Sequence, residues 1–270
     1  MKNHTPIKIQ SVTDFQKKKE LKQKISMLTC YDSWSAQLLD SSSIDALLIG
    51  DSVAMVNHGH KTTIPATLNM MALHCQAVAR SAPHQFLVGD LPFMSYRRSR
   101  FNAVKAAETL MRTGVHSVKL EGAAGNIELV KHLVESGIPV MGHLGLTPQA
   151  LFQLGGFKVQ GKTAEAAKLI KEQAHRLEDA GCFSIVLECV PSSVATEITQ
   201  SLNIPTIGIG AGAETDGQIL VLHDLLGLNQ SFKPKFVRTF LNGAALINEA
   251  IEKYANEVSA KTFPISDESY

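Results

Sequence analysis

The sequence predicts an α/β protein built as a closed (β/α)8 TIM barrel, and three observations lead to this fold. Short apolar runs alternate along the chain with longer stretches in which apolar residues recur at spacings of three and four. The runs are continuously apolar, which is typical of parallel strands buried on both faces. Eight such runs occur, whereas an open doubly wound sheet usually has about five or six strands.

The eight runs are the predicted strands of the barrel. They span residues 25–30, 46–50, 85–89, 115–120, 138–142, 183–187, 204–209 and 218–223. The last run has a second interpretation, because residues 221–224 also suit the start of a helix.

The predicted helices lie between these strands. Helical spacing of apolar residues marks residues 69–81, 98–113, 125–136, 163–180 and 191–201. Gly114, Gly137 and Gly181 each follow a helical pattern and precede a strand, as a glycine that ends a helix in the left-handed conformation does. The chain is therefore expected to be a series of βα units.

Each end of the chain is expected to add a helix. Lys17, Lys18 and Lys19 form a basic run near the start, which we interpret as the solvated face of an N-terminal helix. A long helix is expected over residues 234–260. Because no linker or low-complexity segment interrupts the sequence, residues 1–270 are expected to form a single domain.

Composition and charge limit the classes of function. The chain has 270 residues, with 26 Lys and Arg against 25 Asp and Glu, and its scattered basic residues argue against a nucleic-acid partner. No apolar stretch approaches the ~18 residues of a membrane span, and residues 1–10 lack the apolar core of a signal peptide. We therefore expect a cytoplasmic protein without nucleic-acid or membrane partners. The four cysteines form no CxxC pair, which argues against structural zinc.

Ionisable side chains follow five successive predicted strands. These positions and one adjacent hydroxyl are Asp51, Ser52, Asp90, Lys119, Glu121, His143 and Glu188. In a (β/α)8 barrel the carboxyl ends of all strands meet on one face, so these side chains are expected to share a pocket. Any one acidic residue there could instead cap the following helix, but repetition on neighbouring strands favours a site.

Three of these side chains are carboxylates that together indicate a metal site. Asp51, Asp90 and Glu121 fall on consecutive strands, and three carboxylates at one barrel mouth repel one another unless a cation neutralises them. Mg2+ prefers oxygen ligands and leaves positions for the oxygens of a substrate. We therefore predict a magnesium site.

The remaining ionisable residues suggest how a substrate is bound and how a proton is moved. They are Lys119, His143 and Glu188. Lys119 lies two residues before Glu121 on a strand, so both side chains point to the same side. Its ammonium suits a substrate carboxylate or a developing enolate, or else forms a structural ion pair with Glu121. Glu188 or His143 is a candidate general acid or base, and His143 is equally a candidate for an orienting hydrogen-bond donor.

Two other motifs are ambiguous. His58 and His60 resemble a metal pair, but they fall in a loop after the second strand and are expected to shape it. The glycine string at 208–212 follows the seventh strand, where it suits either anion binding or close approach of neighbouring backbone.

Eight longer motifs lie in order between residues 25 and 243. They are MLTCYD at 27–32, GDSVAM at 50–55, DLPFM at 90–94, VKLE at 118–121, GHLGLTPQ at 142–149, GFKVQG at 156–161, LECVP at 187–191 and IGIGAG at 207–212. Together they resemble the ketopantoate hydroxymethyltransferases, which act on 3-methyl-2-oxobutanoate in the first committed step of pantothenate synthesis. Cys30 and Gly89 stand where that family often has alanine.

The resemblance implies a cofactor, a cosubstrate and an assembly. These are Mg2+, 5,10-methylenetetrahydrofolate as the one-carbon donor, and a homodecamer. Carried onto matching positions, it puts the metal on Asp51, Asp90 and Glu121, and the oxoacid on Asp51, Ser52, Asp90 and Lys119. Glu188 matches the proton acceptor, and His143 is expected beside the substrate.

Two alternative functions share parts of this pattern. A Mg2+-dependent carbon–carbon lyase of the phosphoenolpyruvate/pyruvate barrel group would use the same enolate chemistry, but it is expected to carry a reactive loop cysteine, and none is identifiable. A non-catalytic sensor of 2-oxoacids would need the three carboxylates alone. Chelation alone requires neither Lys119 nor Glu188, so their presence argues against the sensor.

Overall fold

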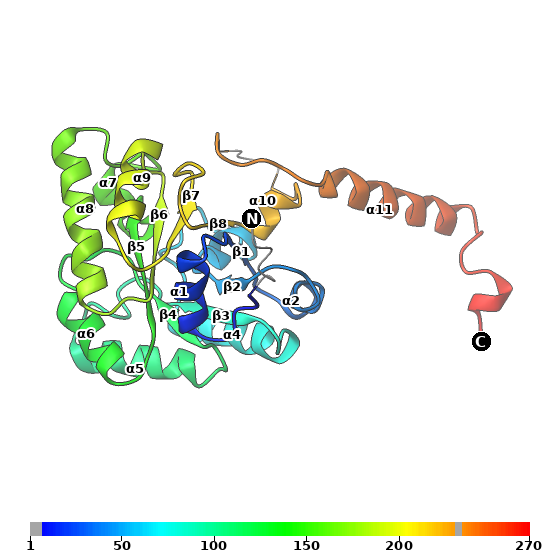
Figure 1. The fold of residues 1–270 in the computed structure, drawn as a ribbon. Coiled ribbons are helices and arrows are strands. Elements are labelled where there is room, and N and C mark those ends of the chain that lie inside the picture. Colours follow the sequence, from blue (N-terminus) through cyan, green and yellow to red (C-terminus); the bar gives the residue numbers. More distant parts are fainter. Residues whose placement is uncertain (1–6, 230–233) are drawn as a thin grey trace. The chain divides into compact units, whose positions relative to one another are not determined.

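In a computed structural model of the chain, eight parallel strands close into a barrel in which β1 pairs with both β2 and β8 (Figure 1). The structure describes residues 7–229 and 234–270. The strands are β1 (Ile25–Thr29), β2 (Ala46–Ile49), β3 (Phe86–Asp90), β4 (Ser117–Lys119), β5 (Val140–Gly145), β6 (Ser184–Glu188), β7 (Thr206–Ile209) and β8 (Gly217–Leu220). The predicted (β/α)8 barrel is confirmed.

Helices alternate with the strands, and Figure 1 shows α5, α6 and α8 along the outside of the sheet. The helices of residues 7–220 are α1 (Val12–Glu20), α2 (Ser33–Asp40), α3 (Val53–Val56), α4 (Leu68–Ser81), α5 (Arg100–Met111), α6 (Ile127–Glu135), α7 (Leu151–Leu154), α8 (Ala164–Asp179) and α9 (Ser192–Ser201), with a 3-10 turn at Pro148–Ala150. Gly114, Gly137 and Gly181 follow α5, α6 and α8 with positive φ, as predicted for glycines that end helices.

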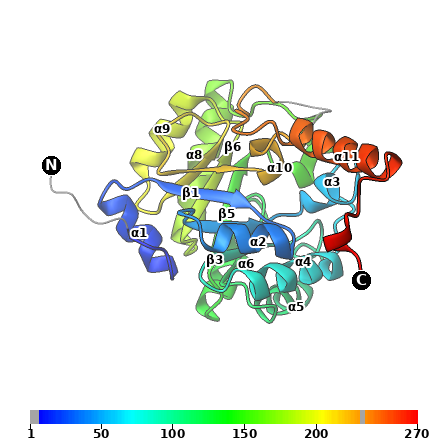
Figure 2. The same ribbon diagram turned by 90° about the vertical axis from the view of Figure 1, so that its right-hand side faces the viewer.

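The N-terminal helix α1 closes one end of the barrel. Its Phe15 is fully buried, and its ring centroid lies 5.2 Å from that of Phe86 and 5.1 Å from that of Phe183. Phe86 begins β3 and Phe183 precedes β6, so Phe15 fills the amino-terminal end of the barrel. In Figure 2 the arrow of β1 points away from α1. The carboxyl ends of the strands are therefore left for a site.

The basic run of α1 corrects one expectation, because it is not a solvated face throughout. Lys17 is exposed and pairs with Asp14 at 2.9 Å, whereas Lys18 is buried in an ion pair with Asp45. The physical reason is that α1 packs across the end of the barrel, where loops that precede strands present carboxylates and carbonyl oxygens.

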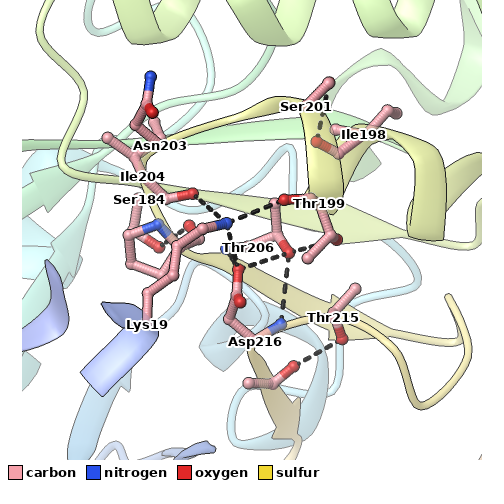
Figure 3. Close-up of polar contacts among 12 residues, drawn as sticks. Lys19, Ser184, Ile198, Thr199, Ser201, Asn203, Ile204, Thr206, Thr215 and Asp216 are labelled. Carbon is pink, nitrogen blue, oxygen red and sulfur yellow. Dashed lines mark hydrogen bonds and ion pairs between the residues drawn. The ribbon is translucent and has the colours of Figure 1, made fainter. Parts of the chain in front are cut away.

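Lys19 makes the most extensive of these contacts (Figure 3). Its Nζ donates to the carbonyl oxygens of Thr199 at 2.9 Å and Ile204 at 3.0 Å, and it lies 2.8 Å from Oδ2 of Asp216. The same carboxylate accepts a hydrogen bond from the backbone amide of Thr206 at 2.9 Å. One lysine thus joins α1 to the segments that lead into β7 and β8.

Val221–Tyr270 forms a second compact unit. It contains α10 (Leu222–Leu225), α11 (Gly243–Ser259) and a 3-10 turn at Ser266–Glu268. The helical interpretation of residues 221–224 is thus correct, and the expected helix over 234–260 begins only at Gly243. Residues before it turn back instead, since the amide of Phe240 donates to the carbonyl oxygen of Leu225 at 2.8 Å. That residues 1–270 form a single domain stays a prediction.

Within residues 7–229 and 234–270, none of the helices combines the length and the apolar character that crossing a bilayer requires.

Candidate active site

The predicted site residues converge at the carboxyl ends of β2 to β6. Asp51, Asp90, Lys119, Glu121 and His143 are each no more than 4% exposed. Burial of so many ionisable side chains is costly unless they pair with one another. Their contacts show that they do.

Strand register explains the central ion pair. Asp90 ends β3, Lys119 ends β4, and the two residues are paired across the parallel strands. Lys119 Nζ lies 2.8 Å from Oδ1 of Asp90. The expected alternative, a structural pair between Lys119 and Glu121, is therefore replaced by a pair with the neighbouring strand.

Asp51 lies beside this pair. Its backbone amide donates to Oδ2 of Asp90 at 3.2 Å. Ser52, which begins the turn into α3, has its hydroxyl 2.8 Å from the phenol oxygen of Tyr31. Tyr31 was not predicted for the site, and it holds the Ser52 hydroxyl next to Asp51.

Gln149 also belongs to the candidate site, although no pattern in the sequence predicts it there. Its side-chain Nε2 donates to Oδ2 of Asp51 at 2.9 Å, and its backbone amide donates to Oε2 of Glu121 at 2.9 Å. It therefore bridges two of the three carboxylates that predicted the metal. The only signal in the sequence is its place at the end of the GHLGLTPQ motif, because a neutral carboxamide does not stand out among ionisable residues.

His143 connects the carboxylate cluster to Glu188. Its Nδ1 lies 3.6 Å from Oε1 of Glu121, and its Nε2 lies 3.1 Å from Oε2 of Glu188. Burial and the ammonium of Lys119, 3.4 Å from Nδ1, disfavour a charged ring. The two carboxylates outweigh these effects and raise the pKa of His143 to about 9. The two carboxylates thus favour the protonated form of the ring.

Glu188 is positioned by a glycine. Gly145, the last residue of β5, pairs in register with Glu188 and has a φ of +89°. This left-handed backbone lets the amide of Leu146 donate to the carbonyl oxygen of Glu188 at 2.8 Å. A Cβ on Gly145 would overlap that carbonyl oxygen. Only glycine accommodates both the conformation and the close approach.

The carboxylates carry more negative charge than Lys119 neutralises. Burial, followed by repulsion from Asp90 and Glu121, raises the pKa of Asp51 well above its ordinary value. Burial also raises the pKa of Asp90, although Lys119 opposes this shift. Burial disfavours ionised Glu121 as well, but the nearby His143 ring, the Lys119 ammonium and the backbone amide of Gln149 together outweigh burial and lower the pKa of Glu121. A further positive charge beside Asp51 and Asp90 would stabilise their ionised forms.

This donor set fits Mg2+ held through two carboxylates. Among the residues that the structure describes, no three His, Cys, Asp or Glu side chains form a complete ligand set. Glu121 instead faces His143 and Gln149. Mg2+ is commonly held by one or two carboxylates, with water and substrate oxygens completing its shell. Asp51 and Asp90 meet that requirement, and the role of Glu121 as a direct ligand stays a prediction.

The two ambiguous motifs have structural explanations. His58 Nε2 lies 3.0 Å from Nε2 of His74, and the backbone amide of His60 donates to the carbonyl oxygen of Ala54 at 2.9 Å. These contacts agree with the expected role in shaping the loop. In the glycine string, a Cβ on Gly208 would lie 2.6 Å from Oγ1 of Thr215, so close packing accounts for that glycine.

The chain matches a family model described as ketopantoate hydroxymethyltransferase over residues 9–266. Curated relatives named 3-methyl-2-oxobutanoate hydroxymethyltransferase agree with this match. The protein from Bdellovibrio bacteriovorus is 57% identical over 97% of this chain and 100% of its own length. That from Coxiella burnetii (strain Dugway 5J108-111) is 54% identical over 93% and 95%, and that from Francisella tularensis subsp. novicida is 53% identical over 97% and 99%.

Solved structures share the fold at low sequence identity. One crystal structure of 2,3-dimethylmalate lyase, a member of the PEP mutase/isocitrate lyase superfamily, aligns with a TM-score of 0.63 at 17% identity, covering 93% of this chain and 86% of that chain. Phosphonopyruvate hydrolase, in a complex with oxalate and Mg2+, aligns with a TM-score of 0.63 at 9% identity, covering 95% and 92%. The lyase alternative is thus matched in fold, whereas the family model and the curated relatives match nearly the whole sequence. The chain belongs to the ketopantoate hydroxymethyltransferase family.

Proposed function

We propose that this protein converts 3-methyl-2-oxobutanoate, 5,10-methylenetetrahydrofolate and water into ketopantoate and tetrahydrofolate. The observation that carries the proposal is the buried cluster at the carboxyl ends of β2 to β6, in a chain of this family. The cluster combines carboxylates, an ammonium and an imidazole, which are groups that can support enolisation of a 2-oxoacid.

The oxoacid is proposed to bind at Asp51, Ser52, Asp90 and Lys119. Asp51 and Asp90 would hold Mg2+, with Glu121 as the third predicted ligand. When bound, Mg2+ acts as a Lewis acid that polarises the keto group. The Lys119 ammonium, fixed by Asp90 at 2.8 Å, stabilises negative charge on the oxoacid oxygens as it develops.

Glu188 is the proposed base. It accepts the proton as the C3–H bond breaks, and the electron pair of that bond enters the enolate. His143 is the proposed orienting residue, because its Nε2 lies 3.1 Å from Oε2 of Glu188. This close contact between the His143 ring and the Glu188 carboxylate would hold Glu188 in one orientation towards the substrate.

The transfer itself balances with one molecule of water. The enolate carbon forms a bond to the folate methylene carbon as the bond from that carbon to one folate nitrogen breaks. Water then supplies the hydroxyl group when the second carbon–nitrogen bond breaks. The proton from C3 and the remaining proton of water end on the two folate nitrogens.

Proton NMR in D2O tests the proposal. The purified protein is incubated with 3-methyl-2-oxobutanoate, with and without Mg2+, and then with 5,10-methylenetetrahydrofolate. We expect Mg2+-dependent loss of the C3 signal before folate is added, and a new hydroxymethyl resonance only afterwards. Exchange without transfer would point to lyase chemistry or another donor. Absence of exchange under all conditions would support the sensor instead.

Two further proposals concern assembly and location. A homodecameric assembly rests on the family resemblance alone, and a location in the cytoplasm rests on the sequence pattern.

A further inference from the structure

A cavity of about 860 Å³ opens beside the carboxylate cluster and is much larger than a five-carbon oxoacid needs. Glu121 and Gln149 form part of its wall, and Gln149 also donates a hydrogen bond to Asp51 of the proposed oxoacid site, so the cavity lies next to that site. Its volume falls within the range of about 300 to 1,000 Å³ that is typical of ligand pockets. The cavity therefore has room for a second, larger substrate next to the first.

The remaining wall of this cavity suits a flat heterocycle with polar edges. Ile64, Phe93 and Phe152 supply apolar surface, and Gln160 and Gln173 supply carboxamides. Gln173 on α8 is half-buried, and its carboxamide forms no hydrogen bond within the described parts of the chain. A pterin ring presents both donors and acceptors along its edge, which a carboxamide complements.

Arg97 also lines the cavity, but its guanidinium is already engaged. It donates to the carbonyl oxygens of Glu121 at 3.0 Å and Ala124 at 3.1 Å. Arg97 therefore holds the loop after β4 in place, and we assign it no ligand.

A second cavity, of about 520 Å³, adjoins the first. The two cavities share the side chains of Ile64 and Phe93. Arg98 and Lys105 line the second cavity, and no acidic residue does. Neither cation forms an ion pair with any residue in 7–229 or 234–270. Two cations without partners in one hollow suit an anionic group.

We infer that the two cavities together bind the folate cosubstrate, with the pterin in the first and the glutamate tail in the second. The inference rests on the proposed function. The orientation of the folate across the two cavities follows from its chemistry. Its methylene carbon lies at the pterin end and must reach C3 of the oxoacid. The pterin therefore lies beside Glu121 and Gln149, and the anionic tail extends past Phe93 towards Arg98 and Lys105.

The tail subsite is tested with the double variant Arg98→Gln/Lys105→Gln. KM for 5,10-methylenetetrahydrofolate is expected to rise about tenfold, since the variant removes charged hydrogen bonds to the glutamate. KM for 5,10-methylenetetrahydropteroate, which lacks the glutamate, is expected to change less than about threefold. The matched control is Arg100→Gln/Lys131→Gln, which removes the same charge from exposed positions outside both cavities.

The pterin subsite is tested with Gln173→Met, which keeps the side-chain length but removes the carboxamide. KM is expected to rise about tenfold for the folate and the pteroate alike, because both carry the pterin. Gln200→Met, on the exposed surface of α9, is the control.

C3 proton exchange without folate separates this inference from the proposed function. All four variants should retain exchange, which reports an intact oxoacid site. If the wild-type protein exchanges and transfers but the cavity variants match their controls in KM, the folate lies elsewhere and the inference is overturned. If the wild-type protein fails to exchange, the proposed function is what fails.

Discussion

The carboxamide of Gln149 donates to Oδ2 of Asp51 over 2.9 Å, and this hydrogen bond joins the loop after β5 to the end of β2. The same Nε2 donates to the carbonyl oxygen of Leu91, and Oε1 accepts from the phenol of Tyr96 at 2.8 Å. These partners fix which end of the amide faces Asp51. A neutral residue thus orients a carboxylate that is proposed to hold Mg2+.

Replacing Gln149 with Met should therefore weaken Mg2+-dependent binding of the oxoacid. Asp51 would lose a buried hydrogen-bond donor, which costs about 1 to 3 kcal/mol, or roughly a 5-fold to 150-fold loss of affinity. Isothermal titration with 3-methyl-2-oxobutanoate at saturating Mg2+ measures the change. Unaltered affinity in a folded Gln149→Met protein would show that this hydrogen bond does not organise the site.

Glu188→Gln should slow C3 proton exchange by a factor of about 100 or more, because an amide does not accept the proton as a carboxylate does. Binding of the oxoacid with Mg2+ should remain close to that of the wild type, since Glu188 lies beyond the carboxylates proposed to hold the metal. NMR exchange and calorimetric titration give the two readouts. Exchange at nearly the wild-type rate would assign the base to another residue.

Asp90→Asn should weaken binding of Mg2+ and of the oxoacid together, because both are proposed to depend on this carboxylate. It also leaves the buried ammonium of Lys119 without its partner at 2.8 Å, so stability should fall by about 3 kcal/mol or more. The double variant Asp90→Asn/Lys119→Met removes both charges and should recover stability without recovering binding. Unchanged oxoacid affinity in either variant would exclude Asp90 from the site.

Lys19→Met should destabilise the protein without altering C3 exchange. The substitution removes the Lys19 donor from two carbonyl oxygens and the ammonium that pairs with Asp216 (Figure 3), which costs about 1 to 3 kcal/mol. Lys17→Met is the matched control, because Lys17 is 57% exposed in its ion pair and such pairs contribute less than about 1 kcal/mol. Equal effects of the two substitutions on urea unfolding would contradict the argument.

The lowered pKa of Asp14 predicts that the free energy of unfolding depends on pH. Its hydrogen bond from Lys17, assisted by the amides of Gln10 and Ser11, lowers its pKa to about 2, against about 4 in an unfolded chain. The depressed pKa means that its contribution is present above about pH 4 and is lost as the pH falls towards 2. Because Asp14 is near the surface, we expect about 1 kcal/mol.

Urea unfolding of wild type and Asp14→Asn between pH 2 and pH 6 measures this contribution. The difference should be largest at pH 6 and should shrink steadily as the pH falls from 4 towards 2. Glu20→Gln, at the other end of α1, serves as the control for loss of a carboxylate. A difference that stays constant with pH would mean that ionisation of Asp14 does not stabilise the folded state.

Most of the barrel could be predicted because its strands are local patterns. Strands such as β2 and β3 are buried along their whole length, so their sequences are apolar runs, apart from Asp90 at the end of β3. The start of α11 could not be predicted, since residues before Gly243 have helical spacing but bond back to α10. A competing contact from outside the segment decided that boundary.

The order of strands and the polar residues that follow them were determined by the sequence alone, and they predicted a shared pocket with Asp51, Asp90, Lys119, Glu121, His143 and Glu188. Closure of the barrel turns that order into proximity. Which of these side chains pair was decided only by the tertiary structure. The register of β3 with β4 places Lys119 in an ion pair with Asp90. The turn after β5 places Gln149 within hydrogen-bond distance of Asp51. Such pairings depend on angles and distances between separate elements, which no pattern within a single segment encodes.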